Sequence, residues 1–183
     1  MNILIIGSST GGPRIIFDIF KGIQHVSIAI IIVQHMPEST TYRFAQRLSH
    51  LSLMTVIVPK GGEILKQNSI YVAPGDNHLT FKNNESIILE KSEKVNFVRP
   101  SIDVTMMSLS RDPGHSYYGI ILSGMGKDGA QGISHLKKIG AQVFVQDPDT
   151  CTIKSMPEAT MNLTKVDQVL SPEEIKNYIL SIK

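Results

Sequence analysis

Two short aliphatic runs near the amino terminus constrain the fold of this chain more than any other feature. Residues 3–6 and 28–33 contain no polar side chain, so they do not alternate between a buried and an exposed face. Strands of this kind are covered on both faces, as in a parallel sheet. Between them, Pro13 is placed to begin a helix in which Ile16 and Phe20 recur at helical spacing. The two runs therefore predict a β-α-β unit with a right-handed crossover.

The same alternation continues along the rest of the chain. Helices are expected over residues 39–51, 101–110 and 130–139, and strands over residues 55–58, 70–73, 118–122 and 142–145. A last helix is predicted after Ser171, where Pro172 and Glu174 complete a capping box. The pattern is typical of an α/β fold built on a parallel sheet.

A hairpin and the chain length complete the predicted architecture. Residues 78–82 and 86–90 alternate in polarity around Asn83-Asn84, which predicts an antiparallel hairpin at a sheet edge. No repeat or linker interrupts the chain, and 183 residues correspond to about one domain of ~150 residues. We expect one domain, residues 1–183: a doubly wound, mostly parallel sheet with helices on both faces and an antiparallel hairpin insertion.

Charge and composition exclude several classes of function. A net charge of +2 gives no reason to expect nucleic-acid binding. The apolar runs fall short of the ~20 residues of a membrane span, and the N-terminus has no signal-peptide pattern, so we expect a cytoplasmic protein that does not insert into a membrane. Cys151 is the only cysteine, which excludes an internal disulfide and a cysteine-based zinc site. We expect no metal and no cofactor.

The residues that follow the strands are the candidates for chemistry, because an open parallel sheet binds ligands outside the carboxyl ends of its strands. Ser9 follows the first strand, within Gly7-Ser8-Ser9-Thr10-Gly11, which fits the G-x-S-x-G pattern of a nucleophile elbow. His35 directly follows the second strand, and Asp128 follows the strand over residues 118–122 in a glycine-rich loop. Three strand ends thus supply a hydroxyl, an imidazole and a carboxylate.

These three groups predict nucleophilic catalysis. The serine would attack a carbonyl, the histidine would accept its proton, and the aspartate would orient the imidazole. Backbone N–H groups at Thr10 or around Met125 would stabilise the oxyanion. Asp147 also follows a strand and competes with Asp128 for the third role, and position alone does not separate them.

Six blocks of sequence carry a resemblance to a known family. They are Gly7-Ser8-Ser9-Thr10-Gly11-Gly12, Gln34-His35-Met36-Pro37, Ala73-Pro74-Gly75-Asp76, Arg99-Pro100-Ser101-Ile102-Asp103, Gly124-Met125-Gly126-Lys127-Asp128-Gly129-Ala130 and Met156-Pro157-Glu158-Ala159. In content and order they are similar to those of the CheB-type chemotaxis protein-glutamate methylesterases, and they span nearly the whole chain.

The resemblance implies a serine hydrolase with Ser9 as nucleophile, His35 as base and Asp128 as the residue that orients the base. It also places Thr10 and Met125 near the oxyanion. The implied reaction removes methyl esters from glutamates on the cytoplasmic helices of chemotaxis receptors and releases methanol. In many members of the family a second activity deamidates receptor glutamines to glutamate.

The sequence departs from the family pattern in two respects. Ser8 stands where the family often has alanine, so two adjacent hydroxyls are present. Family members usually carry an N-terminal receiver domain that is phosphorylated, whereas here the first catalytic strand follows Met1 almost at once. We therefore expect constitutive activity or a separate regulatory partner.

Other interpretations of the same residues stay open. The loop after the first strand is also suited to a flavodoxin-like module that binds the phosphate of a flavin or of another ligand. The triad is equally compatible with a small-molecule serine esterase. Cys151 as a nucleophile is disfavoured because no histidine lies near it in sequence. The basic residues Arg14, Arg43, Arg47 and Lys127 could steer an acidic helix toward the site, although an ordinary solvated surface also explains each of them.

Overall fold

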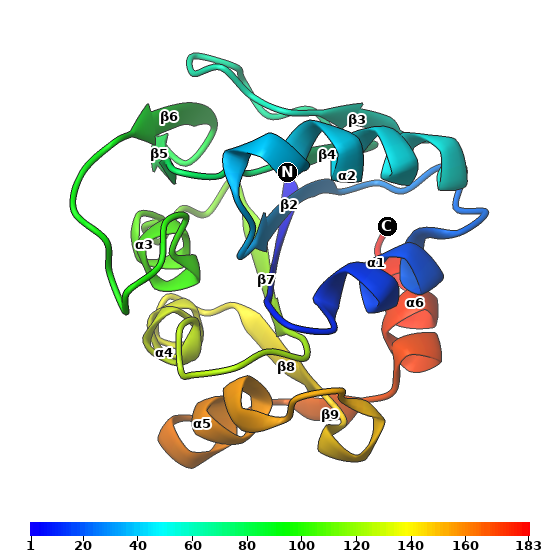
Figure 1. Ribbon diagram of the computed structural model, residues 1–183, viewed down its shortest axis with the longest axis vertical. Coiled ribbons are helices and arrows are strands. Elements are labelled where there is room, and N and C mark those ends of the chain that lie inside the picture. The colour runs from blue at the N-terminus through cyan, green and yellow to red at the C-terminus, as the bar shows by residue number, and fades with distance from the viewer.

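A seven-stranded, wholly parallel sheet forms the centre of the computed structural model, which describes residues 1–183 (Figure 1). Its strands are β1 (Asn2–Ser8), β2 (Ala29–Gln34), β3 (Thr55–Ile57), β4 (Ser69–Val72), β7 (Ser116–Ile121), β8 (Gln142–Gln146) and β9 (Gln168–Leu170). Their order is β3-β4-β2-β1-β7-β8-β9, and each neighbouring pair is parallel. The aliphatic runs of β1 and β2 lie at the centre of the sheet, which confirms the prediction of a parallel sheet.

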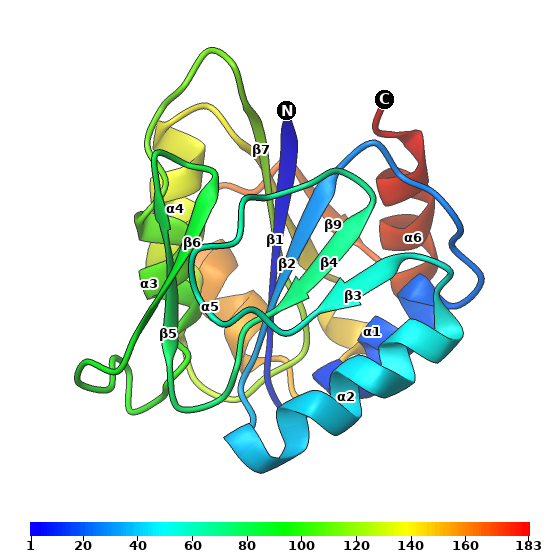
Figure 2. The same cartoon turned by 90° about the horizontal axis from the view of Figure 1, so that it is seen from above.

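Helices cover both faces of the sheet, as Figure 2 shows. One face carries α1 (Gly12–Phe20), α2 (Glu38–Leu51) and α6 (Pro172–Ser181), and the other carries α3 (Ile102–Met107), α4 (Ala130–Lys138) and α5 (Ser155–Leu163). Alternate residues of β1 divide between two buried cores: Leu4 and Ile6 pack on the α1 side, and Ile3 and Ile5 on the α3 side. Each such fully buried aliphatic side chain stabilises the fold by about 1.5–3 kcal/mol. The doubly wound arrangement is confirmed.

The hairpin strands β5 (His78–Lys82) and β6 (Ser86–Glu90) have the predicted bounds, but the expected position at a sheet edge is wrong. They form a separate two-stranded sheet that packs on α3. The physical reason is the burial of apolar hairpin residues such as Leu79 and Phe81, which join the core on that side of the main sheet. The turn at Asn83-Asn84 has positive φ at both residues, as a tight hairpin turn requires.

The C-terminal third contains elements that the sequence pattern did not predict. A 3₁₀ turn spans Pro148–Thr150, and it is followed by α5 and by the three-residue strand β9. Neither α5 nor β9 has a clear sequence signal, because α5 lacks a side-chain cap and β9 is very short. The capping box of α6 is present as predicted: the Glu174 carboxylate accepts from Ser171 N at 2.8 Å.

All seven strands end at the same edge of the sheet, which faces the viewer in Figure 1. Strands β2, β4 and β3 lie on one side of β1 within the sheet, and β7, β8 and β9 lie on the other. The order of strands therefore reverses between β1 and β7, which is the topological switch point. Loops that follow neighbouring strands therefore meet at this point. No helix in the structure combines the length and the apolar character needed to cross a membrane.

Candidate active site

The loops that carry the three predicted catalytic side chains lie side by side at the switch point. Strand β1 pairs with both β2 and β7, so the residues that follow these strands are neighbours. Two backbone hydrogen bonds join the loops: His35 N donates to Ser8 O at 3.0 Å, and Ser9 N donates to Ser123 O at 3.0 Å. The convergence expected from the positions of these residues in the sequence is present in the structure.

His35 and Asp128 form a direct hydrogen bond across the switch point. The distance from His35 Nε2 to Asp128 Oδ2 is 2.8 Å, and the two side chains are only 10% and 3% exposed. An ionised carboxylate only accepts hydrogen bonds, so Nε2 carries a proton, and in the neutral imidazole Nδ1 is then the nitrogen with the lone pair. The free nitrogen of His35 is therefore Nδ1, and this is the atom that can accept a proton from a hydroxyl.

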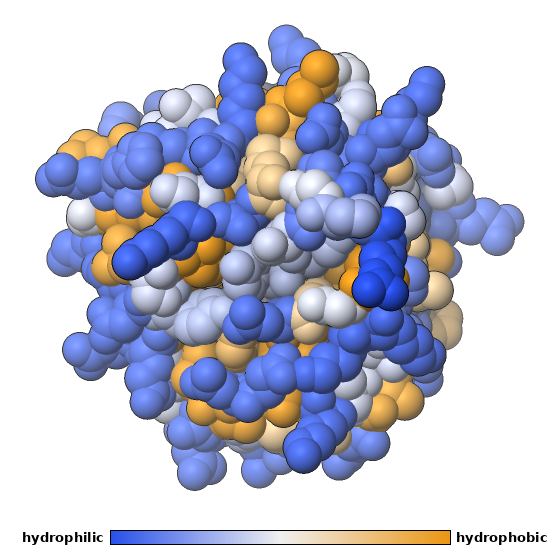
Figure 3. All heavy atoms as spheres, turned by 180° about the vertical axis from the view of Figure 1, so that it is seen from behind, coloured by the Kyte–Doolittle hydropathy of each residue, from blue (hydrophilic) through white to orange (hydrophobic).

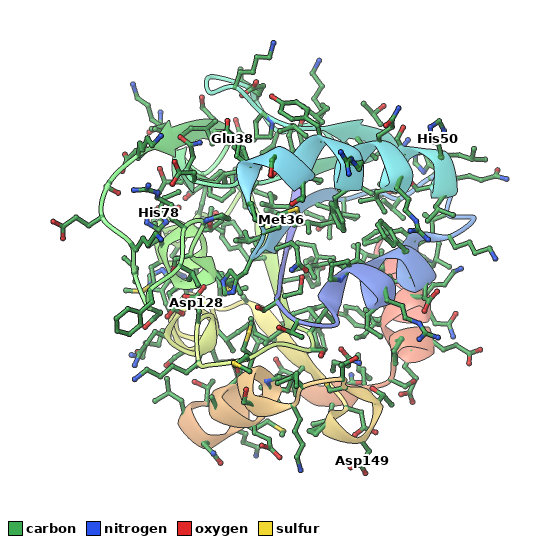
Figure 4. The ribbon with its side chains drawn as sticks, viewed as in Figure 1. Met36, Glu38, His50, His78, Asp128 and Asp149 are labelled. Atoms are coloured by element: carbon green, nitrogen blue, oxygen red, sulfur yellow. The ribbon has the colours of Figure 1, made fainter.

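Several donors surround the Asp128 carboxylate, which lies between α3 and α4 (Figure 4). Besides His35, Ser101 Oγ donates to Oδ1 at 2.7 Å, Asn96 Nδ2 donates to Oδ1 at 3.0 Å, and Ile102 N donates to Oδ2 at 2.6 Å. Burial alone raises the pKa of Asp128, but these hydrogen bonds, led by the one from His35, lower it by more, so that the pKa lies below its usual range. Asp128 therefore stays ionised and holds the imidazole in one orientation.

A second buried carboxylate, Asp103, completes a reciprocal arrangement with Asp128. Asp128 accepts from the first turn of α3, while Asp103 Oδ1 accepts from Gly129 N at 2.9 Å and Gly132 N at 2.7 Å at the start of α4. Asn96 Nδ2 bridges the two carboxylates, 2.9 Å from Asp103 Oδ2. Burial and the nearby charge of Asp128 raise the pKa of Asp103. Each carboxylate thus satisfies amide groups at the beginning of the other's helix, which fixes Asp128 in place.

The two adjacent serines occupy different environments. Ser8 is fully buried, and its hydroxyl donates to Gln34 Oε1 at 2.6 Å. Ser9 is half-buried, and its hydroxyl forms no hydrogen bond, to His35 or to any other residue. Catalytic hydrogen bonds are often long without substrate and tighten in the complex. The left-handed backbone of this turn is at Gly11, with φ 85°, and Ser9 is not among the residues with positive φ.

Gln34 connects the serine loop to the histidine loop. Its Nε2 donates to both Ser9 O and His35 O at 3.0 Å, while Oε1 accepts from Ser8, and the side chain is 2% exposed. The sequence pattern did not single out Gln34, Asn96, Ser101 or Asp103 as functional residues. For Gln34 the available signal was a polar residue ending an otherwise aliphatic strand.

Several backbone amides at the site have no acceptor within the protein. They include those of the exposed residues Thr10 and Met125, and also those of Gly11, Lys127 and Asp128. The amides of Ser9, Gly12, Gly124 and Gly126 are used internally. The two loops touch: a Cβ added to Gly124 would lie 2.8 Å from Ser9 Cβ and 2.1 Å from Met156 Sδ, so only glycine fits there. The free amides are suited to an oxyanion close to Ser9.

The competing candidates lie outside this arrangement. Asp147 accepts from Asp149 N at 3.0 Å and caps the 3₁₀ turn. Figure 4 shows Asp149 at the lower edge of the view, apart from Asp128. The Cys151 thiol donates to Asp147 O and has no histidine partner. Burial, followed by the charges of Asp147 and Glu158, raises the pKa of Cys151 to about 11, so it stays a thiol near neutral pH.

The four basic residues of the sequence hypothesis are exposed, and none forms an ion pair in the structure. The Arg47 guanidinium lies 4.7 Å from the ring centroid of Phe17, beside a cavity of about 460 Å³ that Arg14 also lines. Three or more His, Cys, Asp or Glu side chains do not gather anywhere in a way that could hold a metal ion.

Comparisons with known proteins identify the family of the chain. The protein-family model described as "CheB methylesterase" matches residues 4–179. A "Protein-glutamate methylesterase/protein-glutamine glutaminase" from Methanococcus maripaludis is 38% identical over 176 residues, which cover 94% of this chain and 48% of the relative. A relative of the same name from Thermotoga maritima is 36% identical and covers 98% of this chain and 54% of its own length. The chain thus spans about half the length of these curated relatives.

A solved structure shares the whole fold. The crystal structure of the Thermotoga maritima CheB methylesterase catalytic domain superposes with a TM-score of 0.91 at 36% sequence identity. The match covers 97% of this chain and 96% of the solved chain. The similarity therefore extends over both layers of helices and the sheet.

Proposed function

Because the chain belongs to the CheB methylesterase family, we propose that it is a serine hydrolase that removes methyl groups from glutamate methyl esters of chemotaxis receptors and releases methanol. Support comes from the names of the relatives and from the hydrogen bond between His35 Nε2 and Asp128, which leaves Nδ1 free beside the loop of Ser9. That single hydrogen bond carries the proposal. It distinguishes a base that is oriented for catalysis from a histidine that only fills space.

The first half-reaction forms an acyl-enzyme. Ser9 Oγ attacks the ester carbonyl carbon while its proton passes to His35 Nδ1, and the carbonyl oxygen becomes an oxyanion. The Thr10 and Met125 amides would donate to this oxygen, an interaction for which removal of one donor costs about 2.7–4 kcal/mol. The oxyanion then re-forms the carbonyl, and the C–O bond to the methoxy group breaks. His35 gives its proton to the methoxy oxygen, and methanol leaves.

The second half-reaction restores the serine. A water molecule gives a proton to His35 and attacks the acyl carbon, and the C–O bond to Ser9 breaks as Ser9 recovers the proton. The product is a glutamate side chain. Throughout, ionised Asp128 stabilises the imidazolium that forms in each half-reaction.

The same groups could deamidate glutamine. Ser9 would attack the side-chain amide, and His35 would protonate the departing nitrogen so that ammonia leaves. An amide nitrogen is a poorer leaving group than methoxide, so this reaction depends more strongly on proton delivery from His35. The names of the relatives include this activity, which supports the proposal for the present chain.

Release of methanol from methylated receptor membranes tests the function, with wild type compared to Ser9→Ala. We expect the rate to fall by ~10³-fold or more, as for other triad nucleophiles. Ser8→Ala is the matched control, because Ser8 is an adjacent hydroxyl already bonded to Gln34; its effect should be no more than a few-fold, consistent with loss of one ordinary hydrogen bond. A Ser9→Ala enzyme that keeps most of its activity would exclude the assignment.

A further inference from the structure

The turn over residues 95–98 presents an aromatic ring to solvent on a strained backbone. Val95 and Val98 pair through two backbone hydrogen bonds, at 3.2 and 3.0 Å, and Asn96 and Phe97 form the turn between them. Their φ angles are 52° and 65°. Asparagine tolerates this left-handed region, but a bulky residue there is an outlier. Phe97 is also 96% exposed, more than any other large hydrophobic residue of the chain.

Neither property of Phe97 is explained by folding. An exposed ring contributes no core packing, and asparagine or glycine would adopt the same backbone without the strain. Backbone strain of this kind is concentrated at sites where function requires a fixed geometry. Aromatic side chains, phenylalanine among them, are also enriched where proteins contact partners. The two observations together indicate a contact with a molecule outside the chain.

The turn is attached to the catalytic carboxylate. Asn96 Nδ2 lies 3.0 Å from Asp128 Oδ1 and 2.9 Å from Asp103 Oδ2, so the residue next to Phe97 is held by the network that orients His35. The backbone that carries the ring is therefore held at a defined position relative to His35 and Asp128. A turn that is ordered before binding loses little backbone entropy when a partner arrives.

Phe97 and His35 also line the same open cavity, which has a volume of about 630 Å³. Met36 and Glu38 form another wall where the chain enters α2, as Figure 4 shows. His35 and Phe97 therefore border one continuous space. A molecule that fills this cavity can contact both residues.

The charges and apolar groups around the cavity define what would fit. Lys94 and Phe97 line the cavity, and Lys94 forms no ion pair; of the two carboxylates in the same lining, Asp76 is paired with Lys91 and Arg99, and Glu38 lies at the start of α2. Lys127 is exposed on the neighbouring loop of Asp128. Met125, which is 66% exposed, provides a second apolar group beside the oxyanion amide. Apolar anchors next to cationic side chains match an amphipathic helix with one aliphatic face and carboxylates beside it.

We infer that Phe97 is a docking anchor for the amphipathic, acidic helix that carries the reacting glutamate ester. The inference rests on the proposed function and adds a contact that determines affinity for the helix rather than the rate of the chemical step. Small esters, which do not extend beyond Ser9 and His35, should not depend on it.

The test compares wild type with Phe97→Asn, because asparagine keeps the left-handed turn and removes only the ring. On methylated receptor membranes we expect KM to rise about tenfold with kcat nearly unchanged, the pattern for loss of a contact made equally in the ground and transition states. Hydrolysis of p-nitrophenyl acetate should stay equal in the two proteins. Phe97→Tyr, which keeps an aromatic ring at this position, should retain most of the affinity for the receptor.

Each alternative outcome overturns the inference in a recognisable way. Equal KM values for wild type and Phe97→Asn on the receptor would show that the ring does not contact the helix. A parallel loss on p-nitrophenyl acetate would show that the ring only supports the active site. A dimer of the wild type in sedimentation equilibrium that Phe97→Asn dissociates, with KM unchanged, would assign the ring to a second copy of the chain. Wild type that hydrolyses the small ester but releases no methanol from receptors would instead refute the proposed function, and with it the basis for this anchor.

Discussion

The two ends of the parallel sheet contain the same types of residue, and yet only one of them forms the arrangement that we propose for catalysis. At the carboxyl end, His35 is bonded to Asp128 beside Ser9. At the amino end, which Figure 3 views, His115 lies between two carboxylates next to a cavity of about 340 Å³ that Ser116 also lines. A search for histidine, carboxylate and serine in proximity would select both places.

The difference lies in the surroundings of the second ring nitrogen. His115 Nε2 is 3.0 Å from Glu85 Oε1, and Nδ1 is 3.1 Å from Asp112 Oδ2, so both nitrogens face carboxylates. Its ring stacks on Tyr117, with centroids 5.9 Å apart and planes 4° apart. This histidine acts as a bridge between surface loops. A general base needs one nitrogen oriented and the other accessible to a substrate. Nδ1 of His115 is buried and has no hydrogen-bond partner, whereas His35 lines an open cavity.

The largest expected effect is a loss of kcat on replacing Asp128, the aspartate that faces His35. Asp128→Asn should lower kcat for methanol release by about 10⁴-fold, because the amide can no longer hold the imidazole in the tautomer with Nδ1 free. Asp112→Asn is the matched change at the amino end and should leave kcat within about twofold, as expected for a surface position away from the reacting atoms. Comparable losses in both variants would mean that the two ends do not differ in function.

An intermediate effect on kcat is expected from replacing Gln34, at the carboxyl end of the sheet. Gln34→Leu leaves the Ser8 hydroxyl and the carbonyls of Ser9 and His35 without their partner, and each buried unpaired group costs about 1–3 kcal/mol. Because the serine and histidine loops are then no longer joined, we expect kcat to fall by about 10–100-fold.

Gln142→Leu is the control for this change. Gln142 is exposed at the amino end of β8 and accepts one hydrogen bond, from the Tyr178 hydroxyl at 2.7 Å. Its replacement should change the free energy of unfolding by no more than about 0.5 kcal/mol and leave kcat unaltered. Urea unfolding and methanol release measure both quantities, and a Gln34→Leu enzyme with normal kcat would contradict the positioning role.

The smallest effect is a difference in how stability depends on pH. The raised pKa of Asp103, caused by burial and then by the charge of Asp128, means that the folded protein binds more protons than the unfolded chain above about pH 4. Stability therefore falls as pH rises through the folded pKa. In Asp103→Asn this fall should be absent, so the free energy of unfolding of the variant relative to wild type should increase with pH above about 4.

Asp112 at the amino end should show the opposite sign. A hydrogen bond from Gly114 N, and then the nearby His115, lower the pKa of Asp112, so ionised Asp112 stabilises the fold above its unfolded pKa and this contribution is lost as pH falls. Asp112→Asn should therefore lose stability relative to wild type on going from about pH 3 to 5. Urea unfolding between about pH 3 and 8 measures both variants, and changes of the same sign would contradict the assigned directions.

Much of the architecture followed from local pattern. Apolar runs without alternation predicted the central strands, and the capping box at Ser171 predicted α6, because both signals depend on neighbours in sequence. The hairpin bounds were predicted for the same reason, but its placement at a sheet edge was not correct. Leu79 of the hairpin packs in a core formed by segments that are distant in sequence. Local periodicity does not indicate which of these segments a hairpin will cover.

The order of strands and loops along the chain was sufficient to nominate Ser9, His35 and Asp128, since the ends of parallel strands must meet at one edge. The folded arrangement supplied the rest: the His35 nitrogen that stays free, the burial of Ser8 beneath Gln34, and the mutual capping by Asp103 and Asp128. These features are contacts between side chains far apart in sequence, whose distances and solvent exposure arise only when the layers pack together. Local propensity acts over a few neighbouring residues. Whether a histidine nitrogen can accept a proton depends instead on its contacts and solvent exposure in the folded chain.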